Sequence, residues 1–298
     1  AGPAGLSAAV NLARRGHRVT LFEADDCIGG QFGIARLIPP GKEEFSETLR
    51  YFTRQLELTG VDVRLGVRAD VADLTGFDDV VVATGVRPRV PEIAGIDRPN
   101  VLSYPQAVRG EAPIGTRVAV IGAGGIGVDV AEFLTHTSSP TMDLAEWKRE
   151  WGGVCDDEDA NGGLSVPQPS PSPREVYLLQ RSSGRIGAGL GKTSGWVHRA
   201  SLKHKGVHEL SGVNYERIDD DGLHISFGAE RRDLRVLAVD TVVVCAGQES
   251  VRDLADELLS AGVTTHVIGG GADVAAELDA KRAIEQGPGS LPGSENLS

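Results

Sequence analysis

The sequence predicts an α/β fold with two Rossmann-like dinucleotide-binding domains with parallel sheets, the first built from both ends of the chain. Three observations lead to this expectation. An apolar strand, a glycine turn and a helix follow one another over residues 118–134. Part of a second glycine turn opens the chain, and two further apolar strands, at 77–85 and 241–247, end in small residues. A chain of 298 residues has room for two ordinary domains.

The segment 118–134 has the order that a dinucleotide site requires. Residues 118–121 are an apolar run typical of a buried parallel strand. In a G-x-G-x-x-G turn the first glycine allows a sharp turn, the second lets backbone approach a pyrophosphate, and the third lets helix and strand pack closely. We interpret the glycines of this turn as cofactor-binding, and the alternative is a structural turn without a ligand. They are Gly122, Gly124, Gly125 and Gly127.

The first residues fit the second half of a similar turn. Gly2 and Gly5 stand where its second and third glycines belong, with Ala4 between them. The strand that should precede the turn is missing, so we expect this chain to be part of a longer one. Residues 19–23 then predict a strand ending at Glu23, where a carboxylate can accept hydrogen bonds from ribose hydroxyls. The alternative is a solvated carboxylate at the end of a strand.

Small residues recur where backbone could lie close to the same ligand. Two glycines and an amide follow the Glu23 strand, and the strand after residue 77 ends in Ala-Thr-Gly. Either segment could be a plain turn, but their place after Glu23 favours cofactor contact. We therefore add to the site Gly30, Gln31, Ala83, Thr84 and Gly85.

The last third of the chain repeats this pattern. A strand at 242–247 ends in Cys-Ala-Gly, and a strand at 267–268 runs into glycines and Asp273 before a predicted helix at 274–285. Backbone N–H groups at Gly270 and the Asp273 carboxylate could meet a diphosphate and its ribityl chain. We expect the first domain to comprise 1–113 and 241–287. The second is 114–240 with an insertion around 135–173, and 288–298 is predicted to be a flexible tail.

The strand predicted at 175–180 ends beside Arg181 and Ser182 instead of an acid. This position faces the adenosine 2′ group, where arginine can pair with a 2′-phosphate through charge-assisted hydrogen bonds. We therefore predict NADP in the second domain and FAD in the first, a layout suited to passing a hydride from nicotinamide to flavin. The alternative for Arg181 is a surface residue. A basic, glycine-rich stretch at 184–205 could steer phosphates or be merely solvated.

Composition excludes several classes of protein. The net charge is −12, whereas a non-specific nucleic-acid surface needs a basic footprint. No apolar run is long enough to span a bilayer, and no signal peptide is visible. Cys27, Cys155 and Cys245 are far apart, which favours a reducing compartment. We expect a cytoplasmic protein without nucleic-acid or membrane partners. Hydride transfer between cofactors needs no side-chain acid or base, so we predict no catalytic residue. No histidine pair in the basic stretch has metal-binding spacing together with a third ligand, so we predict no metal ligand.

Several motifs resemble the C-terminal half of the bacterial NADPH-dependent 2,4-dienoyl-CoA reductases, within the old-yellow-enzyme/trimethylamine dehydrogenase group. The resemblance covers nearly all of residues 1–287. Its specific pieces are Ile28-Gly29-Gly30-Gln31-Phe32, Gly41-Lys42-Glu43-Glu44-Phe45, the glycines of 122–127, Leu190-Gly191-Lys192-Thr193 with Gly195-Trp196, Asp219-Asp220-Asp221-Gly222-Leu223-His224, and Ala276-Glu277-Leu278-Asp279-Ala280.

The resemblance implies a flavoprotein in which NADPH reduces FAD. Electrons would then pass through a [4Fe-4S] cluster to FMN in an N-terminal barrel, where an acyl-CoA substrate is reduced during fatty-acid β-oxidation; barrel, FMN and cluster lie outside this chain. By matching positions, NADP would be held by Arg181 and Ser182, although the family often has a second basic residue at the latter. Compared with the family's pattern, the glycine–Asp segment of this sequence carries an extra small residue around 271–272. FAD would be held by Ala4, Glu23, Gln31, Lys42 and Ala69.

Other functions remain open from the sequence alone. A dithiol reductase of the thioredoxin reductase type shares the two-nucleotide layout, but the sequence has no C-x-x-C pair. A diaphorase that passes electrons to another protein fits the motifs better than such a dithiol reductase. A nucleotide-binding subunit without turnover is the non-enzymatic alternative, and reduction of bound flavin by NADPH would distinguish it from either enzyme.

Overall fold

The computed structural model describes residues 1–39, 41–154, 164–272 and 280–289. They form two compact units, each described by itself. The first comprises 1–36, 44–87 and the described part of 248–298, and the second comprises 37–43 and 88–247. The predicted α/β fold with parallel strand pairing is confirmed, and so is a first unit built from both ends of the chain.

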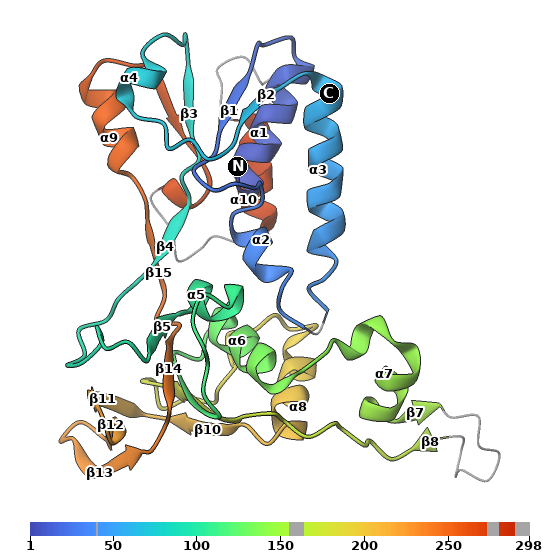
Figure 1. The fold of residues 1–298 in the computed structure, drawn as a ribbon, viewed down its shortest axis with the longest axis vertical. Helices are drawn as coiled ribbons and strands as arrows, with labels where there is room; N and C mark the ends of the chain where they lie inside the picture. The colour runs from blue at the N-terminus through green and yellow to red at the C-terminus, as the bar shows by residue number, and fades with distance from the viewer. Residues whose placement is uncertain (40, 155–163, 273–279, 290–298) are drawn as a thin grey trace. The chain divides into compact units, whose positions relative to one another are not determined.

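The first unit pairs short parallel strands and packs helices against them (Figure 1). Strand β1 pairs with β2, and β16 pairs in parallel with β3, which joins the two ends of the chain. Its elements are α1 (Pro3–Arg14), β1 (Thr20–Phe22), α2 (Gln31–Ala35), α3 (Phe45–Thr59), β2 (Asp62–Arg64), α4 (Val71–Leu74), β3 (Val80–Val82), β15 (Gln248–Ser250), α9 (Asp253–Ser260), β16 (Thr265–Val267), the 3-10 helix η3 (Gly269–Gly271) and α10 (Ala280–Gly289); β4 (Val86–Pro88), the partner of β15, runs from this unit into the second.

Helix α1 is the centre of the first unit. It begins after Gly2, which has extended backbone angles, with Pro3 preset for the first helical turn. Its apolar face, including Leu6 and Val10, packs against α3. On another side it contacts α10, where the Ser7 hydroxyl donates to the carbonyl of Ile284 at 2.8 Å. The N- and C-terminal parts of the chain therefore share one core.

The second unit is built on a five-stranded parallel sheet with the order β10-β9-β6-β14-β5. An antiparallel group of three strands, β11-β12-β13, lies between β10 and β14 in the chain. The elements are β5 (Val101–Ser103), α5 (Tyr104–Arg109), β6 (Arg117–Ile121), α6 (Gly125–Thr135), the 3-10 helix η1 (Pro140–Met142), α7 (Leu144–Trp151), β7 (Gly153–Val154), β8 (Leu164–Ser165), β9 (Glu175–Gln180), α8 (Gly195–His204), β10 (His208–Ser211), β11 (Val213–Asp219), β12 (Gly222–Phe227), β13 (Arg232–Leu237) and β14 (Thr241–Val244).

The register of this sheet aligns the ends that matter for binding. Ile121 pairs with Val244 on one side and with Leu179 on the other. The carboxyl ends of β6, β9 and β14 therefore meet at one edge, the edge at which parallel α/β sheets bind ligands. Residues 118–121 are at most 1% exposed, as their unbroken apolar run predicts.

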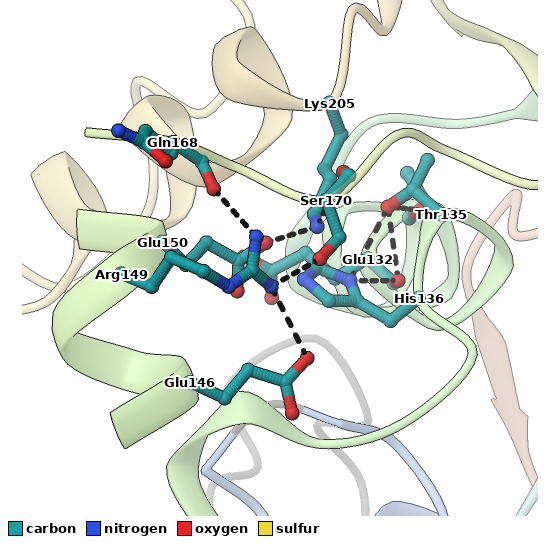
Figure 2. A network of polar contacts seen from close by, with 10 residues as sticks. Glu132, Thr135, His136, Glu146, Arg149, Glu150, Gln168, Ser170 and Lys205 are labelled. Atoms are coloured by element: carbon teal, nitrogen blue, oxygen red, sulfur yellow. Dashed lines mark hydrogen bonds and ion pairs between the residues drawn. The ribbon is translucent and has the colours of Figure 1, made fainter. Parts of the chain in front are cut away.

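The predicted insertion at 135–173 is held to α8 by a buried ion pair. Glu150 of α7 and Lys205 just after α8 point toward one another, with Ser170 beside them (Figure 2). Their side chains are 5% and 3% exposed, and the Lys205 ammonium also donates to the Ser170 carbonyl at 3.0 Å. Trp151 contacts His204, so a tryptophan takes part in ordering this segment.

The structure differs from the predicted domain boundaries in several places. Residues 37–43, 88–113 and 241–247, assigned to the first domain, lie in the second unit. For the last two segments the reason is the sheet, since β5 and β14 pair with each other and β14 also pairs with β6. Helix α10 runs to Gly289, past the predicted start of the tail at 288. Residues 273–279 and 290–298 lie outside the described residues. They include Asp273, the Ala276–Ala280 motif except its last residue, and the rest of the predicted tail.

Candidate dinucleotide sites

Glycine is sterically required at two positions of the turn after β6. Gly122 has φ +103°, and a Cβ there would lie 2.3 Å from the carbonyl oxygen of Cys245. A Cβ on Gly127 would lie 1.8 Å from the carbonyl oxygen of Gly122. Neither contact is possible for a real side chain, so these glycines set the turn and the close helix–strand packing.

The two middle glycines of the turn are different. A Cβ on Gly124 or Gly125 would meet no atom within 4 Å, and both residues are exposed. Gly124 caps α6 in an extended conformation, with no side chain satisfying the first N–H groups of the helix. The chain's own packing does not require glycine here. Bare backbone N–H groups at a helix N-terminus are the feature that binds a phosphate.

Arg181 and Ser182 directly follow β9, the strand next to β6. Both side chains are exposed, and the backbone around them is fixed. The Ser182 carbonyl accepts the N–H of Gly212 at 2.9 Å and the side-chain amide of Gln180 at 3.1 Å. The N–H of Gly122 donates to the Leu179 carbonyl at 2.9 Å, so the end of β9 and the glycine turn are directly joined.

A charge cluster on α6 and α8 lies close to this turn. Nδ1 of His198 is 2.9 Å from Oε2 of Glu132, whose side chain is 2% exposed. Asp129, one turn earlier on α6, is ion-paired with Lys42. The hydrogen bond to Glu132 raises the pKa of His198 above its usual 6.5, and this effect outweighs burial, which lowers it.

Sequence reasoning missed this cluster. Lys42 was predicted to contact FAD, and the structure places it in the second unit, against Asp129. His198 was seen only as part of a basic stretch. The signal that could have found the cluster is Glu132, an acid on the apolar side of a helix, because a buried carboxylate needs a partner.

In the first unit, predicted residues from separate segments come together around the start of α1. A Cβ on Gly30, at φ +49°, would lie 3.0 Å from the Cα of Gly2. A Cβ on Gly5 would lie 3.3 Å from the Cβ of Ala83, at the end of β3. These approaches bring backbone from α1, α2 and β3 to one place.

The returning C-terminal segment joins the same place. A Cβ on Gly270 would lie 3.0 Å from the carbonyl carbon of Gly85. A Cβ on Gly269, at φ +64°, would lie 2.7 Å from the Cβ of Ala4. Gly269 was not in the predicted site, although it is part of the same glycine run. The Thr84 hydroxyl donates to the Val251 carbonyl at 2.5 Å, so its side chain stabilises the return.

Glu23 is partly buried just after β1. Its carboxylate accepts the N–H of Asp25 at 2.9 Å. Burial raises the pKa of Glu23, and the backbone hydrogen bonds from Asp25 and Ala24 lower it. These hydrogen bonds favour the ionised carboxylate, which suits the acceptor role predicted for it.

The remaining predicted residues are placed as follows. Ala69 packs in the core cluster with Phe22, at the end of β1. The side-chain amide of Gln248 lies 3.5 Å from the side-chain oxygen of Gln31, at the start of α2.

Among the residues that the structure describes, no helix is both long and apolar enough to cross a membrane.

Comparisons with known proteins agree with this geometry. The metal reductase of Desulforamulus reducens is 26% identical over 260 residues, covering 85% of this chain and 37% of that protein. The bilirubin reductase of Mediterraneibacter gnavus is 38% identical over 137 residues, 45% of this chain and 21% of that protein. A solved 2-naphthoyl-CoA reductase in complex with 2-naphthoyl-CoA has a TM-score of 0.77 at 26% identity, covering 96% of this chain and 38% of that one. The chain thus spans less than half the length of these relatives.

The profile of one protein family matches residues 1–272, which is most of the chain. The match includes both glycine turns, the strands that precede or follow them and the returning segment up to residue 272. The chain therefore belongs to the pyridine nucleotide-disulphide oxidoreductase family, a family of flavin-dependent NAD(P)H oxidoreductases.

Proposed function

We propose that this chain binds FAD in its first unit and NADP in its second, and that it transfers hydride from NADPH to FAD. The observation that carries the proposal is the open space at Gly124 and Gly125 between two sterically required glycines. A turn that served packing alone would need glycine only at the first and third positions. The residues present therefore fit a dinucleotide, whose pyrophosphate would lie on the N-terminus of α6.

The chain's own residues would act by binding and orientation. Arg181 and Ser182 would hold the adenosine 2′-phosphate, and Glu23 would accept hydrogen bonds from the ribose of FAD. When bound, NADPH supplies a hydride and FAD accepts it. The two cysteines that the structure describes do not form a redox-active pair. Cys27 is exposed and not in a disulfide, and burial raises the pKa of the Cys245 thiol far above its usual value.

We further propose that the longer protein reduces an acyl-CoA, of the 2,4-dienoyl-CoA type. The support is the set of motifs shared with that reductase group and the similarity to a reductase solved with 2-naphthoyl-CoA. On this proposal FMN and a [4Fe-4S] cluster belong to parts outside this chain, and the protein is cytoplasmic. The similarity to a metal reductase over 85% of this chain favours one alternative, electron transfer to a different acceptor.

The two sites can be tested separately by binding. We expect one FAD and one NADP⁺ per chain. Arg181→Ala should weaken NADP⁺ about 10-fold or more, through loss of a charge-assisted hydrogen bond, and leave FAD binding unchanged. Glu23→Gln should weaken FAD and leave NADP⁺ unchanged. Arg185→Ala, an exposed cation in the following loop, is the control. If neither variant affects its own nucleotide, the site assignment is wrong.

A further inference from the structure

The charge cluster defined above, Lys42, Asp129, Glu132 and His198, is partly shielded from water. The four side chains are 26%, 16%, 2% and 23% exposed. One ligand-type oxygen or nitrogen from each of Asp129, Glu132 and His198 lies within 4.8 Å of the other two. Charges this close and this shielded interact strongly, and removing one leaves another uncompensated.

The cluster is balanced only when His198 is protonated. Two carboxylates, Asp129 and Glu132, then face two cations, Lys42 and His198. These are the charged groups that act on His198 from the elements packed against it: the two acids from α6, and Lys42 from the segment 37–43. Neutral His198 would leave one net negative charge in the cluster.

This cluster lies one helical turn from the proposed phosphate site. Asp129 follows Gly125 by one turn of α6, a rise of about 5.4 Å along the helix axis. A dinucleotide bound at the turn adds negative charge beside two carboxylates. That addition favours the protonated form of His198, because opposite charge nearby stabilises it.

We propose that the charge cluster is a proton-linked positioning site for the nucleotide: binding of its diphosphate at the Gly122–Gly127 turn is coupled to protonation of His198. Protonated His198 keeps Glu132 and Asp129 paired, and thereby holds Lys42 and the start of α8 against α6. His198 is a positioning residue, acting through Glu132 and Asp129. The proposal rests on the proposed function, since it needs a dinucleotide at this turn.

The direction of the pH effect follows from linkage. Nucleotide binding raises the pKa of His198 further, so binding takes up a proton at pH values between the pKa of the free protein and that of the complex. Well below the pKa of the free protein His198 is protonated in both states, and well above the pKa of the complex it is neutral in both states, so uptake should vanish on either side. Uptake of at most about one proton per nucleotide is expected between the two pKa values, measured where the nucleotide's own 2′-phosphate is ionised.

The test is calorimetry of NADP⁺ binding to the full chain in two buffers of different ionisation heat, from pH 5.5 to 9. Wild type should show a maximum of proton uptake within this range and little uptake at pH 5.5. His198→Gln should bind NADP⁺ with no uptake at any pH. His208→Gln is the matched control, an exposed histidine on β10 paired with Glu175, and should behave as wild type.

Each outcome decides a different point. If NADP⁺ binds and wild type takes up no proton, or His198→Gln keeps the uptake, the coupling is wrong and the nucleotide site stands. If NADP⁺ does not bind to wild type at all, the proposed function fails. Should His198→Gln not fold, the pH dependence of uptake in wild type still decides, because uptake that persists below pH 6 contradicts a histidine origin.

Discussion

Individual glycines of the β6–α6 turn have separable tasks, and substitutions can show this. Gly127→Ala places a methyl group on the Gly122 carbonyl, where a Cβ would lie only 1.8 Å from the oxygen. We expect a loss of about 1–3 kcal/mol or more in unfolding free energy. Gly124→Ala enters open space, and the extended backbone at Gly124, with φ −76°, is one that alanine adopts without strain. This substitution should leave stability unchanged while weakening the binding of NADP⁺. Thermal unfolding and NADP⁺ titration of both variants would measure the two effects. Equal stability of the two variants would contradict the steric reading.

Asp240 gives the fold a contribution that depends on pH. Its carboxylate accepts bonds from the Arg117 guanidinium at 2.7 Å, the Arg117 N–H at 2.9 Å and the Thr116 hydroxyl at 3.0 Å. The Arg117 side chain is the main cause that lowers the pKa of Asp240 from 3.8 to about 2. The contribution is complete above pH 3.8 and is lost as the pH falls toward 2.

Asp240→Asn should therefore destabilise the protein at pH 6 and lose most of this effect at pH 2.5. Denaturant unfolding of wild type and variant at both pH values checks this. Asp221→Asn, an exposed carboxylate in the β11–β12 turn, serves as the control and should have little effect at either pH. A difference between wild type and Asp240→Asn that stays constant down to pH 2.5 would count against the ion pair.

At the level of single residues, the sequence predicts glycines better than charged pairs. Gly122 and Gly127 were predicted as positions needed for the turn and for close helix–strand packing, and the structure confirms these steric roles, because that requirement leaves a local mark in the sequence. The pairing of Glu132 with His198 joins residues far apart in the chain, and no local pattern encodes it. Asp273 lies outside the described residues, so its predicted role stays a prediction.

Among the elements, α7 and α8 depend on the buried Glu150–Lys205 pair. Lys205→Met keeps much of the side-chain volume but leaves the Glu150 carboxylate, 5% exposed, without its cation. We expect a loss of about 3–5 kcal/mol, the usual result of breaking one partner out of a buried ion pair. Thermal unfolding measures it.

Two comparisons make that measurement specific. Lys203→Met changes an exposed lysine near the end of α8 and should have little effect. The double variant with Glu150→Leu should recover part of the lost stability, because no unpaired charge remains. A Lys205→Met protein as stable as Lys203→Met would show that the pair does not hold the insertion.

Strands and helices were largely predictable from their patterns. The apolar run at 118–121 and the glycine turn after it define β6 and α6 without further information. The pairing of β5 with β14 was not predictable, since each strand has only a short apolar run and their partnership depends on the sheet order. That is why residues 88–113 were assigned to the other domain.

At the scale of the whole molecule, the two proposed nucleotide sites are assembled from the chain in different ways. In the second unit one contiguous stretch supplies strand, turn and helix. The first unit collects its glycines from the beginning, the middle and the end of the chain. The sequence predicted that return because the same strand-and-small-residue pattern recurs near both ends. The acyl-CoA substrate has no such pattern in this chain, and it stays a proposal.

The most direct measurement is an anaerobic titration of the FAD-reconstituted chain with NADPH, and separately with NADH, while the flavin absorbance is recorded. We expect NADPH to bleach the flavin at close to one equivalent, with NADH requiring much higher concentrations. Arg181→Ala should reduce this preference, and Arg185→Ala should not. If FAD and NADP⁺ both bind but neither reduced nucleotide bleaches the flavin, hydride transfer by this chain is contradicted, and a role in nucleotide binding alone replaces it.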